Sequence, residues 1–420
     1  MKLRKELISS KKAAIILALV LVLGLLARIY VITRFTQGPN THSDDNGYLT
    51  GAITFVKTGY VSYSEPDQQT AAICLGMPFL LGGLIKCFGY TPAGLILVHI
   101  VFSCISLVSA VAVYLLGTLL LNRLSGLIGA TYCALQPSLL SVSCVFLTET
   151  PYVCLNLFAM YFLIRWAEEE KTAFFWSGVL CMIAAAMFKG LALLVLIVPA
   201  VILLRRKTPV LTIMKHAALI LTAFVLCFTP WWVRNYQKIG YFVPFTANRG
   251  DIQLMGSYMG IGYPEGNYED KVVELDAEAW IEGYPFDTER RFARRGEVGK
   301  ERLSQWFDEN PVSFVFSHVV YKPFMLVTSH LQTIPIVPEK LGRLAWYACL
   351  LLALWGLICP RFGTKINNSY YVPLVYLGIS VFATAIYAPL ARYGVPYVPL
   401  WLMYAGAGTS DIIRRFLKAD

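Results

Sequence analysis

The chain has 420 residues, of which 57% are hydrophobic and 15% are charged. Soluble globular chains are about 45–50% hydrophobic and about 25% charged, so this composition excludes a water-soluble fold and predicts an all-α integral membrane protein. The formal net charge is +10, but the cations lie at the ends of apolar runs, which argues against nucleic acid as a partner. The 10 cysteines form no C-x-x-C pair and no metal-binding spacing, so we expect neither disulfides nor a metal site.

The N-terminal segment predicts a first transmembrane helix over residues 13–33, preceded by basic residues. This segment resembles a signal peptide, but no small-residue cleavage site follows it, so we expect the helix to be retained. A hydrophilic stretch comes next and ends in an apolar piece, 74–90, that is predicted not to span the membrane. The first loop, 34–90, is therefore predicted to lie on the outer face.

Nine further spans are predicted from their length and apolar character. They cover residues 92–121, 124–143, 150–165, 172–188, 190–204, 212–233, 342–359, 369–388 and 393–409. Lys189 and Gly190 separate two of these spans, which we interpret as a tight helical hairpin. Only that choice keeps Arg205, Arg206 and Lys207 on the side of the other short basic segments, and such segments mark the cytoplasmic side. The sequence thus predicts about ten transmembrane helices, with both termini cytoplasmic.

The longest hydrophilic segment, 237–340, is predicted to lie outside the membrane. Its residues 296–326 alternate charged and aromatic positions, which predicts amphipathic helices on the membrane surface. The chain then divides into an N-terminal transmembrane module (1–236), the extracytoplasmic loop 237–340 and a C-terminal transmembrane module (341–420). The long loop contains no N-glycosylation sequon, which favours a bacterial plasma (inner) membrane.

Ionisable side chains recur at the predicted outer ends of the spans. They are Asp44 and Asp45 after the first helix, Glu149 at the start of the fourth span, Lys189 in the hairpin, Arg234 at the end of the seventh span and Arg392 at the start of the tenth. Because all of them fall at one depth on one side, we expect them to form a single site. His42 and Tyr48 share the first-loop motif with the two acids. His42, like His99, is interpreted as structural rather than as a metal ligand.

Each of these residues also has an ordinary structural interpretation. Lys189 and Arg234 stand where basic side chains commonly extend to lipid headgroups. Glu149 stands at a helix start, where a carboxylate is favoured by the helix dipole. The acid pair of the first loop is compatible with plain loop residues or with a helix cap. The prediction of a site therefore depends on the whole set.

The chemistry of this set fits sugar transfer from a polyprenyl phosphate. The acceptor alcohol or amine needs a general base, and a carboxylate held close to it can serve. The leaving group is a lipid phosphate, which needs cations where its negative charge develops. Arginine matches phosphate oxygens with its fork, and lysine supplies a point charge. Since the donor is anchored in the membrane, these groups must lie at the membrane surface, where the predicted topology puts them.

The motifs around these residues resemble those of the GT-C glycosyltransferases, in particular the group of the protein O-mannosyltransferases and the aminoarabinose transferase of lipid A. The matching pieces are Asp44-Asp45-Asn46-Gly47-Tyr48, Thr148-Glu149-Thr150-Pro151, Pro230-Trp231-Trp232-Val233-Arg234-Asn235-Tyr236, the stretch Asn248 to Gly256, and Glu309-Asn310-Pro311 followed by Lys322. No piece is specific alone, but their order extends across most of the chain.

The resemblance implies a GT-C-like fold and inverting transfer by single displacement, with Asp44 as the catalytic base. Glu149 is then a second active-site acid. The carrier phosphate is then bound by Lys189, Arg234 and Arg392. Asp45 stands where relatives commonly have glutamate, so it could share or take the role of the base. Some relatives bind a divalent metal at the first-loop acids; without a third clear ligand here, we predict no metal and no other cofactor.

The predicted partners are a polyprenyl-phosphate-linked sugar, membrane lipids, and an acceptor that is a lipid, a glycan or a protein of the cell envelope. Two alternatives stay open at this point. One is a lipid-linked sugar flippase or transporter, although few charged residues besides Arg28, His99 and Lys215 lie within spans, where transport pathways usually need them. The other is a polyprenyl-pyrophosphate glycan polymerase or ligase, which differs mainly in its donor.

Overall fold

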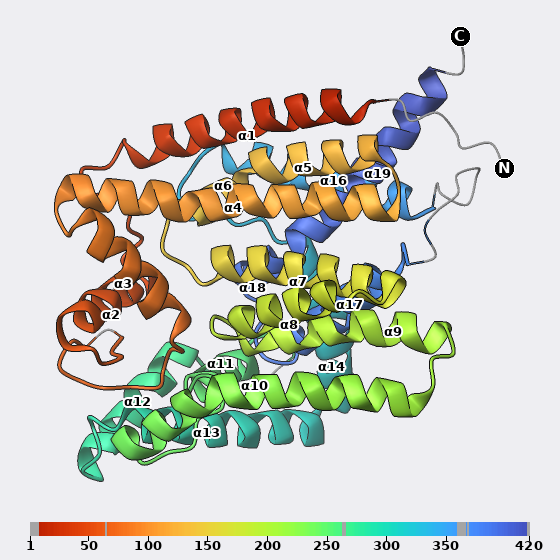
Figure 1. Ribbon diagram of the computed structural model, residues 1–420. Coiled ribbons are helices and arrows are strands. Elements are labelled where there is room, and N and C mark those ends of the chain that lie inside the picture. Colours follow the sequence, from red (N-terminus) through yellow and green to blue (C-terminus); the bar gives the residue numbers. More distant parts are fainter. Residues whose placement is uncertain (1–7, 64, 263–265, 359–366, 368, 418–420) are drawn as a thin grey trace.

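The computed structural model describes residues 8–63, 65–262, 266–358, 367 and 369–417. Within these ranges the regular elements are helices, which confirms the predicted all-α class. Figure 1 shows the long helices side by side, with both ends of the chain at one end of the bundle and α2, α3 and α12 at the other. We term these the terminal end and the α2 end.

The helices follow one another along the whole chain. The first part contains α1 (Ser10–Ile32), α2 (Asp44–Thr58), α3 (Gly76–Phe88), α4 (Pro92–Leu120), α5 (Arg123–Leu135), α6 (Pro137–Ser143), α7 (Glu149–Glu169), α8 (Thr172–Ala186), η1 (Gly190–Leu196), α9 (Ile197–Arg205) and α10 (Val210–Ile239). The middle part contains α11 (Arg249–Ser257), α12 (Tyr268–Ile281), α13 (Thr288–Glu309), α14 (Pro311–Phe316), the π-helical turn η2 (Ser317–Tyr321) and α15 (Lys322–Thr328). The last part contains α16 (Glu339–Ile358), α17 (Val372–Ala385), α18 (Ala391–Gly394), η4 (Val395–Tyr397) and α19 (Val398–Phe416).

The predicted spans all fall on helical segments of the described chain. Within the described residues, four helices, α1, α4, α10 and α16, are long and apolar enough to cross a membrane, and α3, α8, η1–α9 and α17 are shorter apolar helices. The membrane class is thereby confirmed, while the count of ten spans and the sidedness stay predictions. The termini 1–7 and 418–420, and the last residue of the predicted span 342–359, lie outside the described residues.

The predicted span 124–143 is two helices rather than one. α5 ends where Gln136 adopts an extended backbone, and α6 begins at Pro137. A proline inside a helix lacks the N–H group and clashes with the preceding turn, so the helix restarts there. The side chain of Gln136 accepts a hydrogen bond from the backbone N–H of Leu139 at 2.8 Å and thereby caps α6. The break leads directly into the segment before Glu149.

Glycines let α19 approach its neighbours closely. A methyl group on Gly356 of α16 would lie 2.0 Å from the carbonyl oxygen of Tyr404 in α19, and one on Gly408 would lie 2.1 Å from that of Leu352. Such close backbone contacts through small residues are the usual way in which membrane helices associate. α19 is therefore closely packed against α16.

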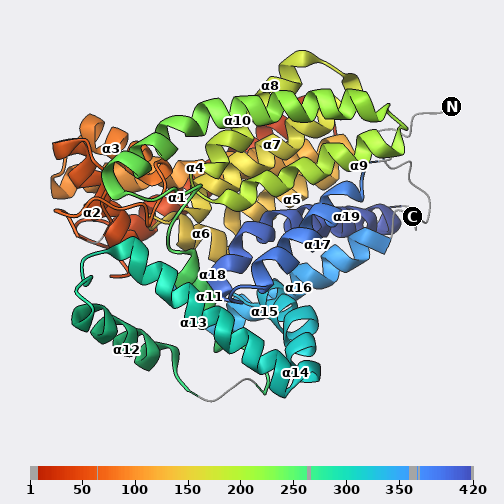
Figure 2. The ribbon, with the colours of Figure 1, turned by 90° about the horizontal axis from the view of Figure 1, so that it is seen from below.

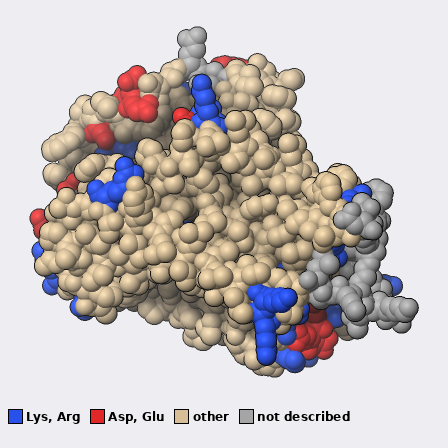
Figure 3. Space-filling model, turned by 90° about the horizontal axis from the view of Figure 1, so that it is seen from above, with Lys and Arg blue, Asp and Glu red and all other residues tan. Residues whose placement is uncertain are grey.

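α10 is the least packed of the four long helices. In an apolar stretch of 18 residues, only 6% of α10 is buried within the protein, compared with 56% of the corresponding stretch of α4. Its exposed side chains are mostly apolar, including Leu211, Leu221 and Leu226. Figure 3 shows another face, the one on the side of α1 in Figure 1, and this face is also broadly uncharged, with acidic and basic side chains gathered away from its middle. Lipid tails are the environment that satisfies such a surface.

The segment after α10 forms helices beside the bundle. Figure 2 shows α12, α13 and α14 along one edge of the molecule. The side chain of Asp287 accepts a hydrogen bond from the backbone N–H of Arg290 at 2.9 Å and starts α13. α13 buries Val298 and Trp306 and exposes Lys300 and Glu301, so it is amphipathic as predicted for residues 296–326. Its contact with a membrane surface stays a prediction.

Lys322, the first residue of α15, is fully buried and contacts α11. The Nζ atom of Lys322 donates a hydrogen bond to the carbonyl oxygen of Gly256 at 3.0 Å and lies 2.8 Å from Nε2 of His318. Burial lowers the pKa of the Lys322 ammonium group to about 7, because the buried site does not solvate the charge. The deprotonated amine still donates to Gly256 and so keeps α15 attached to α11.

We expect the stability difference between wild type and Lys322→Met to depend on pH. Between pH 7 and the ordinary lysine pKa of about 10.4, the unfolded chain binds a proton that the folded protein does not bind. The unfolding free energy of the wild type therefore rises with pH across this window, whereas methionine removes that contribution. Thermal unfolding of both proteins in one detergent at pH 7 and pH 9 measures the effect. If the unfolding midpoints of the two proteins shift equally between pH 7 and pH 9, Lys322 keeps its proton in the folded protein.

Candidate active site

Asp44 lies in the first turn of α2 and faces the centre of the α2 end. Its carboxylate makes an ion pair with the guanidinium group of Arg392 and accepts a hydrogen bond from the hydroxyl group of Tyr63 at 2.6 Å. The side chain is 43% exposed. Asp44 is therefore held in one orientation by two partners and still has a face open to solvent.

Asp45 points away from this centre although it is adjacent in the chain. Its carboxylate accepts hydrogen bonds from the backbone N–H of Thr41 at 2.7 Å, from the Thr41 hydroxyl at 2.8 Å and from the backbone N–H of Ser43 at 3.1 Å. The residue is only 2% exposed. These contacts build the turn that starts α2, so of the two predicted acids only Asp44 faces the site.

His42 and Tyr48 have different places in the same segment. His42 has a positive φ of 54°, and its backbone N–H donates to the side chain of Asn40 at 2.6 Å. Its ring is not in contact with the acids among the described interactions. Tyr48 is buried, and its ring packs edge-on against that of Tyr63 at 5.5 Å between centroids. Tyr48 therefore belongs to the wall of the site, and His42 to the turn.

Glu149 is the buried acid of the site. It is the first residue of α7 and is 0% exposed. Its carboxylate accepts a hydrogen bond from Nε of Arg392 at 2.7 Å and makes an ion pair with Nζ of Lys189 at 3.1 Å. A buried charge is tolerated only when it is paired, and here two cations pair it.

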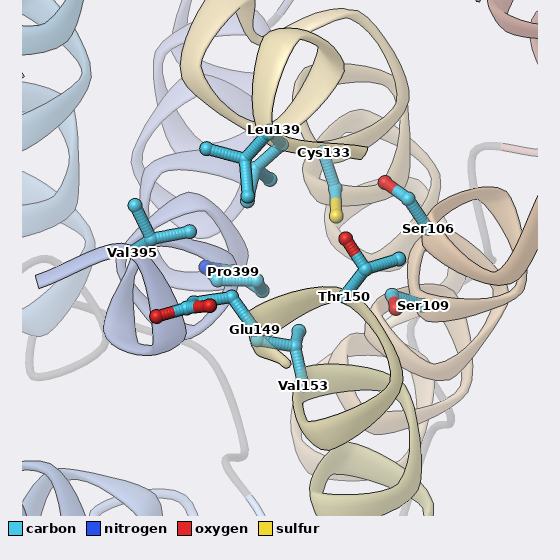
Figure 4. A pocket seen from close by; sticks show the side chains of 10 residues that line it. Ser106, Ser109, Cys133, Leu139, Glu149, Thr150, Val153, Val395 and Pro399 are labelled. Carbon is cyan, nitrogen blue, oxygen red and sulfur yellow. The ribbon is translucent and has the colours of Figure 1, made fainter. Parts of the chain in front are cut away.

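A small cavity lies behind Glu149. Figure 4 shows Glu149 at one side of it and the hydroxyl-bearing side chains of Thr150, Ser106 and Ser109 among the other residues that line it. The cavity offers about 10 Å³ to the centre of a water-sized molecule, which is about enough for one water. Most of the other residues that line this cavity are apolar, so the Glu149 carboxylate depends on Arg392 and Lys189 for its pairing.

Arg392 joins the two acids. It lies in the short helix α18, and its guanidinium group contacts Asp44 and Glu149 together. Burial alone would lower the pKa of Arg392, but the neighbouring carboxylates of Glu149 and Asp44 raise it well above the ordinary value. Arg392 is charged at every accessible pH, and it links α18 to both α2 and α7.

Lys189 is the second cation of the site. It stands between α8 and η1, with its ammonium group against Glu149 and 5.2 Å from the ring centroid of Tyr393. Burial lowers the pKa of Lys189, and the charge of Glu149 only partly restores it. We term Asp44, Glu149, Lys189 and Arg392 the four-residue cluster. Its two negative and two positive charges cancel.

Arg234 is not brought into the cluster. Its guanidinium group donates to the carbonyl oxygens of Thr70 at 2.9 Å and Val61 at 3.2 Å, and to the side chain of Asn235 at 3.0 Å. A further, longer hydrogen bond goes to the side chain of Gln69 at 3.4 Å, so Arg234 contacts the first loop and its own helix. The predicted role of Arg234 in phosphate binding stays a prediction.

Tyr63 is the site residue that sequence reasoning missed. It lies in the first loop. Two glycines one helical turn apart on α2 leave the space that Tyr63 and the backbone of Ser62 occupy. A methyl group on Gly47 would lie 2.6 Å from the Tyr63 ring, and one on Gly51 would lie 2.4 Å from the carbonyl oxygen of Ser62. The spacing of these glycines, i and i+4 on one helix face, was a signal in the sequence.

We therefore expect Gly47→Ala to displace Tyr63 from Asp44. The added methyl group meets the ring of Tyr63, and overpacking of this kind destabilises a protein by about 1–3 kcal/mol. Gly83→Ala on α3 is the matched control, because a methyl group there meets nothing within 4 Å. Thermal unfolding of both variants in detergent compares them. Equal midpoints would show that the Tyr63 ring moves aside without loss.

The acids of the site do not offer a divalent metal a ligand set. Both oxygens of Asp45 accept hydrogen bonds from the turn, and Glu149 is held by two cations. In the described part of the chain, no three His, Cys, Asp or Glu side chains gather as metal ligands. A metal would have to displace Lys189 or Arg392, so we derive no step through a metal.

Comparison with known proteins supports the sequence resemblance. Residues 73–233 match the family model of the dolichyl-phosphate-mannose-protein mannosyltransferases. No curated protein matches the chain in sequence.

Solved structures extend the likeness over most of the chain. The archaeal oligosaccharyltransferase AglB from Archaeoglobus fulgidus, in complex with an inhibitory peptide and a dolichol-phosphate, aligns with 97% of this chain at a TM-score of 0.54 and 11% identity. The chain spans about half of that structure, 52% of its length. The apo form from the same organism aligns with 95% of this chain and 51% of its own at a TM-score of 0.53 and 12% identity.

ArnT from Cupriavidus metallidurans in the apo state is a more distant likeness. The alignment covers 93% of this chain and 77% of the ArnT chain, at a TM-score of 0.45 and 10% identity. The family model and the AglB structures point the same way, and the resemblance inferred from the motifs is confirmed. The chain therefore shares its fold with the AglB oligosaccharyltransferase, and its residues 73–233 are similar to the dolichyl-phosphate-mannose-protein mannosyltransferases.

Proposed function

We propose that the chain is a membrane glycosyltransferase that moves a sugar from a polyprenyl-phosphate carrier to an acceptor at the outer face of the membrane. The observation that carries the proposal is the four-residue cluster, in which an accessible carboxylate and two cations lie together at the α2 end. A base for the acceptor and positive charge for a leaving phosphate are the two requirements of the reaction.

In the proposed reaction, the acceptor oxygen or nitrogen attacks the anomeric carbon of the sugar. Its proton passes to Asp44, whose open face admits the acceptor. The bond between the anomeric carbon and the phosphate oxygen breaks, and that oxygen keeps the electron pair. Attack and departure occur on opposite faces of the sugar, so the anomeric configuration is inverted. Lys189 and Arg392 stabilise the leaving phosphate.

The charges of the cluster fit this sequence of events. The donor carries one negative charge as a phosphodiester, and the released polyprenyl phosphate carries up to two. Asp44 becomes neutral when it takes the proton, which frees Arg392 from one of its two carboxylates. The guanidinium group can then turn its fork toward the phosphate at the moment when the extra charge appears. Glu149 stays paired with Lys189.

The topology of the proposal follows from the basic segments of the sequence. With both termini cytoplasmic, the α2 end and the segment 237–340 face outward, and the polyprenyl chain of the donor lies among lipid tails. A bacterial plasma membrane is the proposed location. The acceptor, which is a lipid, a glycan or a protein, is proposed to bind between the first loop and the segment 237–340.

A transfer assay tests the proposal. The purified protein in lipid nanodiscs is given a panel of polyprenyl-phosphate sugars with a radiolabel in the sugar, together with a membrane extract as acceptor. Label that moves from the carrier to a product of the extract supports the proposal. Donor that is bound or moved across the bilayer but never consumed would refute it in favour of a flippase. Consumption of pyrophosphate-linked glycans alone would indicate a polymerase or ligase.

A further inference from the structure

Two charged residues outside the four-residue cluster hold the first loop. Arg234 lies near the end of α10, and Glu289 lies in the first turn of α13. Figures 1 and 2 show α2 and α3 at the end of the bundle where α10 ends and α12–α13 lie. The two residues therefore come from the N-terminal module and from the long segment 237–340.

Arg234 fixes the two arms of a turn. Thr70 donates its backbone N–H to the carbonyl oxygen of Val61 at 3.0 Å, which closes the segment between them. Arg234 donates to the carbonyl oxygens of both residues. A planar guanidinium group presents several donors in a fixed fork, so one side chain holds both arms at a set distance.

Glu289 contacts the same segment from α13. One oxygen atom, Oε1, accepts hydrogen bonds from the Thr70 hydroxyl at 2.8 Å and from the backbone N–H of Ala71 at 2.7 Å. Glu289 is buried. The carbonyl oxygen of Ala71 in turn accepts from the backbone N–H of Ala247, in the segment that follows α10. Both of these hydrogen bonds come from neutral donors, and the charge of Glu289 in addition attracts the guanidinium group of Arg234.

The segment that Arg234 and Glu289 hold includes Tyr63, the hydrogen-bond partner of Asp44. Tyr63 lies two residues after Val61, and its hydroxyl group donates to Asp44. The preceding residue, Ser62, packs its backbone against Gly51 of α2. A shift of the Val61–Thr70 closure would therefore move Tyr63 relative to α2, and with it the hydrogen bond that orients the Asp44 carboxylate.

We infer that Arg234 and Glu289 form a clamp on the first loop and are positioning residues for Asp44, acting through Tyr63. The segment 237–340 thus contributes to the site by holding the loop that orients the base. The role of Asp44 in this inference rests on the proposed function, whereas the clamp itself rests on the contacts of Val61, Thr70 and Ala71.

Amide hydrogen exchange of the full-length protein in nanodiscs tests the clamp without any substrate. Glu289→Ala removes both acceptor contacts, so exchange in peptides covering 61–72 is expected to rise. Glu289→Gln keeps an oxygen in the position of Oε1 and is expected to leave exchange as in the wild type. Glu297→Ala, an exposed acid on the same helix, is the matched control. Unchanged exchange in Glu289→Ala and in Arg234→Lys would overturn the clamp.

Kinetics of sugar transfer test the positioning role. Glu289→Ala is expected to lower kcat about tenfold, the effect of one or two net hydrogen bonds, with the KM for the donor unchanged. Glu289→Gln is expected to restore most of kcat, because both hydrogen bonds need only an acceptor oxygen at the position of Oε1 and the variant loses only the attraction of the charge for Arg234. Arg234→Lys is expected to lower kcat as well, and the double variant to be little worse than either single one, because both act on one segment.

Failure of the clamp and failure of the proposed transferase function would give different experimental results. A rise in donor KM for Arg234→Lys, with kcat and exchange unchanged, would overturn the clamp and show that Arg234 binds the carrier phosphate. Failure of Glu289→Gln to restore kcat would show that the charge is needed, against the inference. If the wild type transfers no sugar from any donor, the proposed function fails, and the exchange of 61–72 still decides the clamp.

Discussion

Replacing Asp44 by asparagine is expected to lower kcat for sugar transfer by about 10²- to 10⁴-fold, the usual contribution of a general base. Asparagine has nearly the same shape and still accepts the hydrogen bond that Tyr63 donates to Asp44, so the loop keeps its place. It cannot take the proton of the acceptor. The measurement is the initial rate of label transfer at saturating donor, for wild type and variant in nanodiscs.

Two control variants show which acid is the base. Asp67→Asn changes an exposed acid of the same loop and is expected to leave kcat unchanged. Asp45→Asn disturbs the turn that its carboxylate caps, so its expected loss is one of stability, seen in the unfolding midpoint. A loss of kcat in Asp45→Asn that exceeds the loss in Asp44→Asn, with both proteins folded, would move the base to Asp45.

Replacing Arg392 by lysine is expected to lower kcat by about 10²- to 10³-fold, as removal of a donor that stabilises transition-state charge does in other enzymes. One ammonium group cannot contact Asp44 and Glu149 together as the guanidinium fork does. The donor KM is expected to rise as well, because a lysine ammonium group cannot bind two phosphate oxygens with the fork that a guanidinium group offers. Rates over a range of donor concentrations give both constants.

Stability needs its own control in this case. Breaking a buried ion pair destabilises a protein by about 3–5 kcal/mol when one charge is left behind. Arg392→Met leaves Glu149 with Lys189 alone, whereas Arg392→Met combined with Glu149→Gln removes one charge of each sign. We expect the double variant to unfold at a higher temperature than the single one and to stay inactive. Activity in the double variant would exclude Arg392 and Glu149 from the chemistry.

The depth of the site residues could be predicted from the sequence, but their position around the bundle could not. Helix ends placed Glu149, Lys189, Arg234 and Arg392 at one level, and three of them meet. Arg234 stands on another side, because hydropathy fixes where a helix ends and says nothing about its neighbours. Successive residues of a helix point about 100° apart, so only one acid of the first-loop pair could face the centre.

Tyr63 and Arg28 show what local patterns leave out. Tyr63 lies in a segment without periodicity, and its contact with Asp44 depends on glycines of another element. Arg28 stands inside an apolar span, where a charge predicts a functional site. It donates instead to the carbonyl oxygen of Ala134 at 2.9 Å and to the Ser143 hydroxyl at 3.0 Å. The break between α5 and α6 makes this carbonyl available, and that break follows from Pro137.

α10 exposes an apolar surface along its sides, and its last turns contact the first loop. Only 6% of its apolar 18-residue stretch is buried within the protein. The same helix carries Arg234, whose guanidinium group donates hydrogen bonds to Val61 and Thr70. A bilayer thinner or thicker than the helix changes its tilt at a cost of a fraction of a kcal/mol per Å of mismatch. Such tilting would move the guanidinium group against the loop that orients Asp44. The acyl-chain length of the surrounding lipids would thus act as a physical control on the geometry of the base, at a distance from any lipid that reacts.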